Sequence, residues 1–138
     1  MDLYEDALPA LQFLAARWPV VALSNGNASV HVVGIGEHFH AALSATKAGM
    51  AKPDVRFFHA AAAAAGVAPD EVLHIGDDAR LDALGAMDAG MHAVWLNRTG
   101  VAWPHEGSTP HVTVASLAQL CQGLADSCPC LPAKPRHA

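Results

Sequence analysis

Three polar segments of this chain carry residue types that could act together on a phosphate group. Ser24-Asn25-Gly26 follows a short apolar run, Lys52 precedes a proline, and Asp77-Asp78 follow a second apolar run. Hydroxyl and backbone N–H groups in such a turn can hold phosphate oxygens, and a lysine adds a compact positive charge. Adjacent carboxylates repel each other unless a cation lies between them, and Mg²⁺ prefers oxygen ligands and shares its shell with phosphates. We therefore expect phosphate binding at Ser24, Asn25, Gly26 and Lys52, and a magnesium site at Asp77 and Asp78.

Each of these residues also has an ordinary structural interpretation. The serine and asparagine fit a turn followed by a helix cap, the lysine fits a solvated charge, and the aspartate pair fits the start of a helix. Asp82 lies one helical turn beyond Asp78, where it is either a surface carboxylate or a brace for the preceding loop. The combination of all these groups is what favours a functional site.

The elements that must position these groups follow from the apolar pattern. Short apolar or β-branched runs predict strands over 20–23, 40–44, 72–76, 92–96 and 111–114. Helical spacing or helix-favouring residues predict helices over 4–18, 53–65 and 81–89, a short one near 32–35 and one beginning at 117, with a loop over 46–52. This alternation is typical of an α/β fold with a parallel sheet. The polar segments then meet at the carboxyl ends of the strands.

Composition narrows the classes of partner and compartment. Lys plus Arg is 8 and Asp plus Glu is 13, so the net charge is −5, which disfavours nucleic-acid binding. No apolar run is long enough to cross a bilayer, and the acidic N-terminus lacks signal-peptide features. The cysteines are confined to Cys121, Cys128 and Cys130, which is consistent with a reducing, cytoplasmic location. We expect residues 1–125 to form one core domain and residues 126–138 to form a disordered tail.

Three segments together resemble the haloacid dehalogenase-like (HAD) hydrolases over about residues 4–100. Leu23–Asn27, Lys52–Asp54 and His74–Asp82 are similar to the family's second, third and fourth motifs, in the same order. The resemblance implies a Rossmann-like three-layer core with a parallel sheet.

The resemblance also implies a role for each matching residue. Ser24 would bind the transferring phosphoryl group, and Lys52 would act as a catalytic residue by neutralising that group and the nucleophile. Asp77 would hold Mg²⁺, and Asp78 would ligate it or support its water shell. Asp82 would have a structural role or would act through the residues that contact the ligand.

The chain departs from the family at the first motif. That motif is a strand ending in Asp-x-Asp that supplies the nucleophile and the general acid/base, and no such segment occurs in this sequence. The chain thus resembles the C-terminal part of such a hydrolase, an incomplete core without the central nucleophile strand and the cap domain. The strands over 20–23 and 72–76 would then have open edges, so we expect marginal stability, direct pairing of the two strands, or self-association.

These observations predict a Mg²⁺-dependent phosphatase for a small phosphorylated metabolite in a longer parent protein, with this chain inactive alone. The alternative is a non-catalytic phosphate- or metal-binding module. A haloacid dehalogenase is less favoured, because the Asp77-Asp78 pair suits a metal that dehalogenases do not need. A receiver-like signalling domain has the opposite motif order. His38 with His40, and Cys128 with Cys130, are weaker candidates for metal binding.

Overall fold

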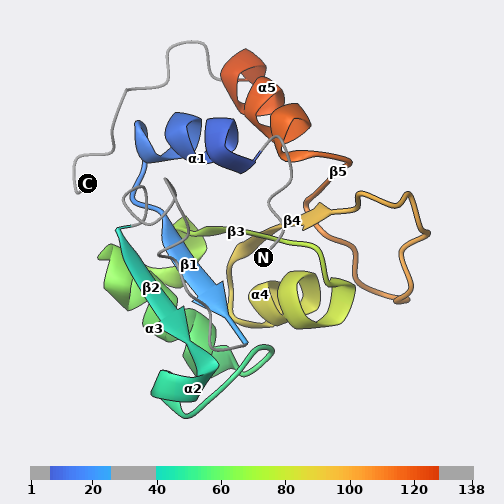
Figure 1. Ribbon diagram of the computed structural model, residues 1–138. Helices are drawn as coiled ribbons and strands as arrows, with labels where there is room; N and C mark the ends of the chain where they lie inside the picture. Colours follow the sequence, from blue (N-terminus) through green and yellow to red (C-terminus); the bar gives the residue numbers. More distant parts are fainter. Residues whose placement is uncertain (1–6, 26–39, 128–138) are drawn as a thin grey trace.

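The computed structural model describes residues 7–25 and 40–127, in which helices and strands alternate along the chain (Figure 1). The strands are β1 (Val21–Ser24), β2 (Ala41–Ser44), β3 (Leu73–Gly76), β4 (His92–Leu96) and β5 (Val112–Val114). The helices are α1 (Ala7–Ala15), α2 (Ala45–Ala48), α3 (Val55–Ala65), α4 (Gly85–Asp88) and α5 (Leu117–Ser127), with a 3-10 turn, η2 (Pro69–Glu71), and a π-helical segment, η3 (Ala79–Leu84). The predicted α/β class is confirmed.

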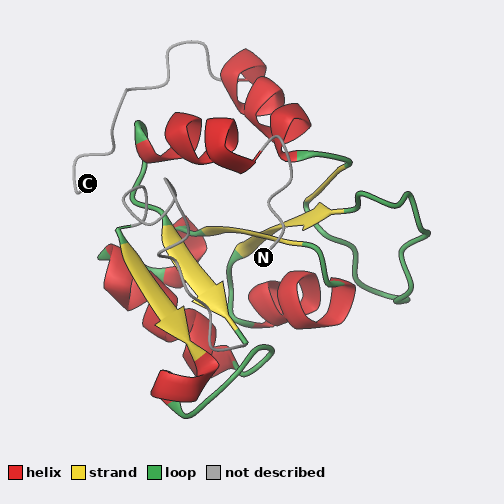
Figure 2. Cartoon of the chain, viewed as in Figure 1, coloured by secondary structure: helices red, strands yellow, loops and turns green. Residues whose placement is uncertain are grey.

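The strands form two small parallel sheets rather than one continuous sheet (Figure 2). β1 pairs with β2, while β3, β4 and β5 pair in that order. In the part of the chain that the structure describes, β1 and β3 do not pair with each other, so the expected direct pairing of these strands is not found. The small sheets are consistent with the predicted incomplete core.

Helices cover both faces of the larger sheet. Along β4, Ala93 and Trp95 pack in a cluster with residues of α3, η3 and α4. Val94, in contrast, packs against Val114 of β5 and Leu120 of α5. This alternation is what a strand buried on both faces requires, because successive side chains point to opposite sides. Figure 1 accordingly shows α5, together with α1, on the side of the strands opposite α3 and α4.

A shared helical layer holds the two sheets together. Phe58 and Ala62 of α3 are buried in the same cluster as Trp95 of β4, and Leu23 of β1 packs against that cluster. The alanine-rich face of α3 allows this close approach, since its side chains are small. The site groups at the ends of β1 and β3 are thereby held over one common support.

Several helix boundaries differ from the predictions, and α1 ends at Ala15 rather than at Trp18. The expected loop over 46–52 contains the short helix α2, capped by the Ser44 hydroxyl and ended by Gly49 in the left-handed conformation. Helix α3 begins after Asp54, whose side chain accepts a hydrogen bond from the Arg56 backbone N–H, so Asp54 rather than Pro53 marks its start. The helix expected from 81 instead begins as η3 at Ala79.

Other predictions concern the ends of the described ranges. Helix α5 runs to Ser127, two residues beyond the expected end of the domain at 125. The expected short helix near 32–35, His38 and the Cys128–Cys130 pair lie outside the described residues. No helix within residues 7–25 or 40–127 combines the length and the apolar character needed to cross a membrane.

Gly85 offers a test of the packing between η3, α4 and α3. A Cβ atom there would lie 2.7 Å from Phe58 Cε2 and 3.0 Å from Pro53 Cβ, and the Phe58 ring is fully buried. We expect Gly85→Ala to lower the free energy of unfolding by about 1–3 kcal/mol, because the buried Phe58 ring has no space into which it can move. Gly123 of α5 has open space at its Cβ position, so Gly123→Ala should instead stabilise by up to about 1 kcal/mol. Urea denaturation of the two variants checks this, and equal effects would contradict it.

Candidate active site

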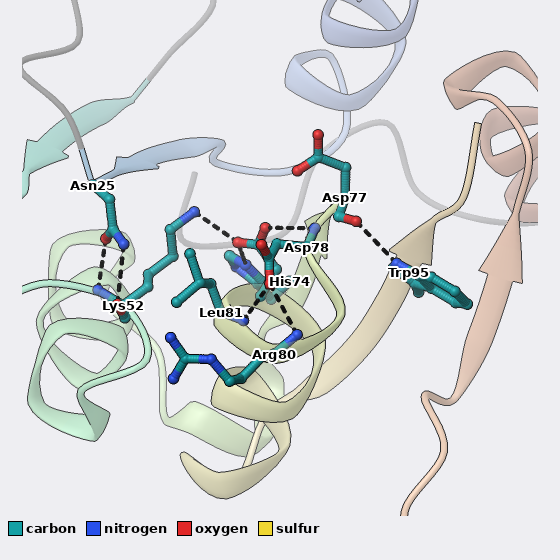
Figure 3. A network of polar contacts seen from close by, with 9 residues as sticks. Asn25, Lys52, His74, Asp77, Asp78, Arg80, Leu81 and Trp95 are labelled. Atoms are coloured by element: carbon teal, nitrogen blue, oxygen red, sulfur yellow. Dashed lines mark hydrogen bonds and ion pairs between the residues drawn. The ribbon is translucent and has the colours of Figure 1, made fainter. Parts of the chain in front are cut away.

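The predicted site residues gather at the carboxyl ends of β1 and β3 and at the segment that leads into α3 (Figure 3). Ser24 is the last residue of β1 and Asn25 follows it, whereas Asp77 and Asp78 follow β3. Lys52 lies between α2 and α3. Gly26 lies outside the described residues. The structure therefore brings together the segments that the sequence placed at one sheet edge.

Asn25 fixes the backbone of Lys52. Its side-chain Oδ1 accepts a hydrogen bond from the Lys52 backbone N–H at 2.6 Å, and its Nδ2 donates to the Lys52 carbonyl at 3.0 Å. The side-chain amide thus satisfies both backbone polar groups of a residue 27 positions away. The sequence assigned Asn25 to phosphate binding, whereas in the structure its side chain positions the lysine.

Asp82 is the centre of the polar network. Its Oδ1 accepts hydrogen bonds from Lys52 Nζ at 2.7 Å and His74 Nε2 at 2.9 Å, and its Oδ2 accepts one from the Asp78 backbone N–H at 3.2 Å. Only 4% of Asp82 is exposed, and it is the one buried charged residue among those described. A buried carboxylate is costly unless it is paired and hydrogen-bonded, and here three donors meet that requirement.

The environment of Asp82 keeps it ionised. Burial by itself raises the pKa of this carboxyl, but the hydrogen bonds from His74 and Lys52 and their charges outweigh burial. The net result lowers the Asp82 pKa from 3.8 to about 2. Since an ionised carboxylate only accepts hydrogen bonds, His74 must donate through Nε2–H. The Lys52 ammonium therefore faces a fixed negative charge.

Two local features allow Asp82 to reach this position. A Cβ atom on Gly76 would overlap the Asp82 carboxyl group, so only glycine leaves room at the end of β3. The Asp78 carbonyl accepts hydrogen bonds from both Asp82 N and Ala83 N, which gives the wide π-helical turn of η3. Such π turns are frequent at functional sites.

The two adjacent aspartates have different roles in the structure. Asp78 caps η3, because its Oδ1 accepts hydrogen bonds from the backbone N–H groups of Arg80 and Leu81 at 2.9 and 2.7 Å. Asp77 is exposed, and its backbone carbonyl accepts a hydrogen bond from Trp95 Nε1–H at 2.9 Å. Figure 3 shows the Asp77 side chain directed away from Trp95. Both residues are exposed, but the Asp78 carboxylate is engaged at the start of η3, so Asp77 is the stronger candidate for a ligand.

The described residues are suited to bind Mg²⁺ with only one or two protein side chains as ligands. They contain no cluster of three or more His, Cys, Asp or Glu side chains arranged around a common point. Mg²⁺ usually keeps several waters and uses one or two carboxylates together with substrate phosphate, so the exposed Asp77 carboxylate suits it. Asp78, already engaged at the helix start, could support the water shell.

Two residues of this network were missed from the sequence. His74 alternates with Gly76 along β3, so both face Asp82, and this two-residue spacing was the available signal. Trp95 pairs in register with Gly76, yet no local pattern indicated its contact with Asp77.

The low pKa of Asp82 predicts a specific pH dependence of stability. Because the folded pKa is about 2 and the reference value is 3.8, the ionised carboxylate stabilises the fold above pH 3.8. This contribution, about 2 kcal/mol, is lost as the pH falls through about 2. We expect Asp82→Asn to abolish it in urea denaturation between pH 2 and about 5. The exposed Asp88→Asn should keep the wild-type profile, and parallel profiles for wild type and Asp82→Asn would contradict the assignment.

Comparisons with known proteins agree on one family. A family model for haloacid dehalogenase-like hydrolase matches residues 1–90. The chain is 33% identical over 129 residues to 5-amino-6-(5-phospho-D-ribitylamino)uracil phosphatase YigB of Escherichia coli (strain K12), covering 87% of this chain and 52% of that protein. It is 37% identical over 87 residues to phosphoserine phosphatase of Thermus thermophilus, covering 63% and 34%. The chain thus spans about half, or less, of the length of these curated relatives.

Solved structures give the same result. The 2-haloacid dehalogenase from Pseudomonas syringae pv. Tomato DC3000 superposes with a TM-score of 0.85 and 34% identity, over 91% of this chain and 54% of that chain. The family model, the curated relatives and this structural match all point to the Rossmann-type hydrolase core that the motifs suggested. The chain belongs to the haloacid dehalogenase-like hydrolases.

Proposed function

We propose that this site is part of a Mg²⁺-dependent phosphatase that acts on a small phosphorylated metabolite. The observation that carries the proposal is the Lys52 ammonium, held by buried Asp82 at the edge where Ser24 and the exposed Asp77 also lie. A positive charge, a hydroxyl and an outward carboxylate are the groups that a metal-bound phosphate needs. The names of the two curated relatives described above, both phosphatases, support this choice.

Each residue has a defined task in this proposal. The Ser24 hydroxyl, with the backbone N–H groups of its turn, binds phosphoryl oxygens. The Lys52 ammonium neutralises charge on those oxygens. Asp82 orients this ammonium, and the Asn25 side chain holds the Lys52 backbone through two hydrogen bonds. Asp77 holds Mg²⁺, and Asp78 keeps its loop in place by capping η3. Mg²⁺ supplies positive charge that stabilises the phosphate during transfer.

The attacking carboxylate of the family's mechanism has no counterpart in this sequence. We propose that this chain alone binds Mg²⁺ and phosphate without turnover, and that a longer parent protein supplies the nucleophile. A module that only binds phosphate or metal would have the same site, and it differs in lacking turnover in every context.

A dehalogenase is the second candidate, because the structural match from Pseudomonas syringae is a 2-haloacid dehalogenase. The exposed carboxylate of Asp77 favours the phosphatase, since an accessible carboxylate suits a divalent cation better than a neutral carbon–halogen bond. We further propose a cytoplasmic location, in line with the cysteines being confined to the C-terminal end, and no nucleic-acid partner, in line with the net charge of −5.

Binding measurements on the full chain test the proposed ligands. We expect isothermal titration calorimetry to detect Mg²⁺, with Asp77→Asn weakening its affinity at least about tenfold because a direct ligand is lost. Lys52→Met should weaken binding of inorganic phosphate by a similar factor. The matched controls Asp88→Asn and Lys47→Met change exposed residues of α4 and α2 and should bind like wild type.

Hydrolysis assays separate the remaining alternatives. Robust Mg²⁺-dependent hydrolysis of p-nitrophenyl phosphate by the chain alone would show that the nucleophile is not missing. Absence of any Mg²⁺ binding by this chain, combined with release of halide from a 2-haloacid by the longer parent protein, would replace the phosphatase proposal with the dehalogenase.

The open edges of β1 and β3 lead to a prediction about self-association. Each has a strand partner on one side only among the described residues, and Leu73 of β3 is 40% exposed. We expect light scattering after size exclusion to show concentration-dependent association, because unpaired edges accept strands from other chains. Leu73→Lys should reduce it, whereas Val101→Lys, which replaces a 54% exposed loop residue, should not. A monomer at all concentrations would rule out association through these edges.

A further inference from the structure

The segment between β4 and β5 has no regular secondary structure, but side chains within it form hydrogen bonds to its own backbone. Asn97 Nδ2 donates to the Val101 carbonyl at 2.7 Å, and the Val101 N–H donates to Asn97 Oδ1 at 3.2 Å. Farther along, the Trp103 indole N–H donates to the Ser108 carbonyl. These bonds give residues 97–111 a defined shape although they form a long connection.

Aromatic contacts join this segment to β4. The His105 ring lies edge-to-face with Trp103 at a centroid distance of 5.4 Å, and Trp103 lies edge-to-face with Trp95 at 5.0 Å. Only 4% of Trp95 is exposed. Edge-to-face pairs are favourable beyond the area they bury, so Trp103 restricts the orientation of the Trp95 indole.

The Trp95 indole acts on the same peptide group as Asp82. Trp95 Nε1–H donates to the Asp77 carbonyl at 2.9 Å, and the N–H of that peptide group, which belongs to Asp78, donates to Asp82 Oδ2 at 3.2 Å. Both partners are almost fully buried. Because the peptide is planar, these two bonds at its opposite ends fix its rotation, and they constrain ψ of Asp77.

We propose that Trp95 is a positioning residue for Asp77, held in place by Trp103. The indole fixes the peptide that follows Asp77 and so sets the direction in which the Asp77 side chain leaves the backbone. The segment 97–111 thereby takes part in the site without contributing a ligand. This inference rests on the proposed function only for the identity of what Asp77 binds.

Trp95→Phe tests the proposal, because it keeps an aromatic ring in the core and removes only the N–H donor. We expect hydrogen exchange of the Asp78 backbone amide, followed by NMR, to become about five- to tenfold faster, since one hydrogen bond that holds this peptide is lost. Mg²⁺ affinity should fall by a similar factor. Trp18→Phe is the matched control: it also replaces an indole by a phenyl ring, but Trp18 lies between α1 and β1 and takes no part in the proposed positioning, so both quantities should remain as in wild type.

The two measurements distinguish the inference from the proposed function. Unchanged exchange at Asp78 in Trp95→Phe would overturn the positioning role, whatever the metal affinity. Faster exchange together with no Mg²⁺ binding by the wild-type chain would support the positioning role and overturn the proposed metal site. Amides of β5, measured in the same spectra, report general destabilisation. Equal acceleration there and at Asp78 would assign Trp95 to core packing alone and overturn the proposal.

Discussion

The buried carboxylate of Asp82 imposes the strictest requirement in this structure. An ionised group at 4% exposure must find donors, and it finds them in Lys52 before α3, in His74 of β3 and in the Asp78 backbone just after β3. Gly76 must lack a side chain to admit it. Satisfying one charge therefore fixes the lysine, the end of β3 and the turn after it in a single arrangement. The geometry that the fold needs for stability is also the geometry of the site.

The same polar network connects the two halves of the core. β1 and β3 are not paired with each other, so no ladder of backbone hydrogen bonds joins the sheets in the described part of the chain. Asn25, just after β1, holds the Lys52 backbone, and the Lys52 side chain reaches Asp82 beside β3. Beneath this path, Leu23 and Trp95 share the apolar cluster of α3. One polar path and one helical layer thus join the two sheets in the described part of the chain, so the residues of the site also help to connect the core.

The positions of the strands could be predicted from the sequence more accurately than the contacts between side chains. Apolar runs located β3 and β4 within a residue, because burial on both faces leaves a continuous pattern. The four-residue helix α2 and the π turn of η3 were not predicted, since both depend on caps and wide-turn hydrogen bonds rather than on periodicity. Spacing placed Asn25 at the correct strand end but could not show that its amide would bind the Lys52 backbone. Likewise, the sequence predicted a supporting role for Asp82, but its hydrogen bond with His74 became apparent only in the structure.

The adjacent aspartates show how packing can give different roles to identical side chains. Asp78 caps η3, and the peptide that joins it to Asp77 is held at both ends, by Trp95 and by Asp82. Neither constraint involves a ligand. The direction in which the Asp77 side chain leaves the backbone is therefore set by buried groups, and a backbone held in this way loses less conformational entropy when the site binds a ligand. A cation or phosphate at this edge therefore meets an ammonium that Asp82 already holds and a carboxylate that extends from a fixed backbone.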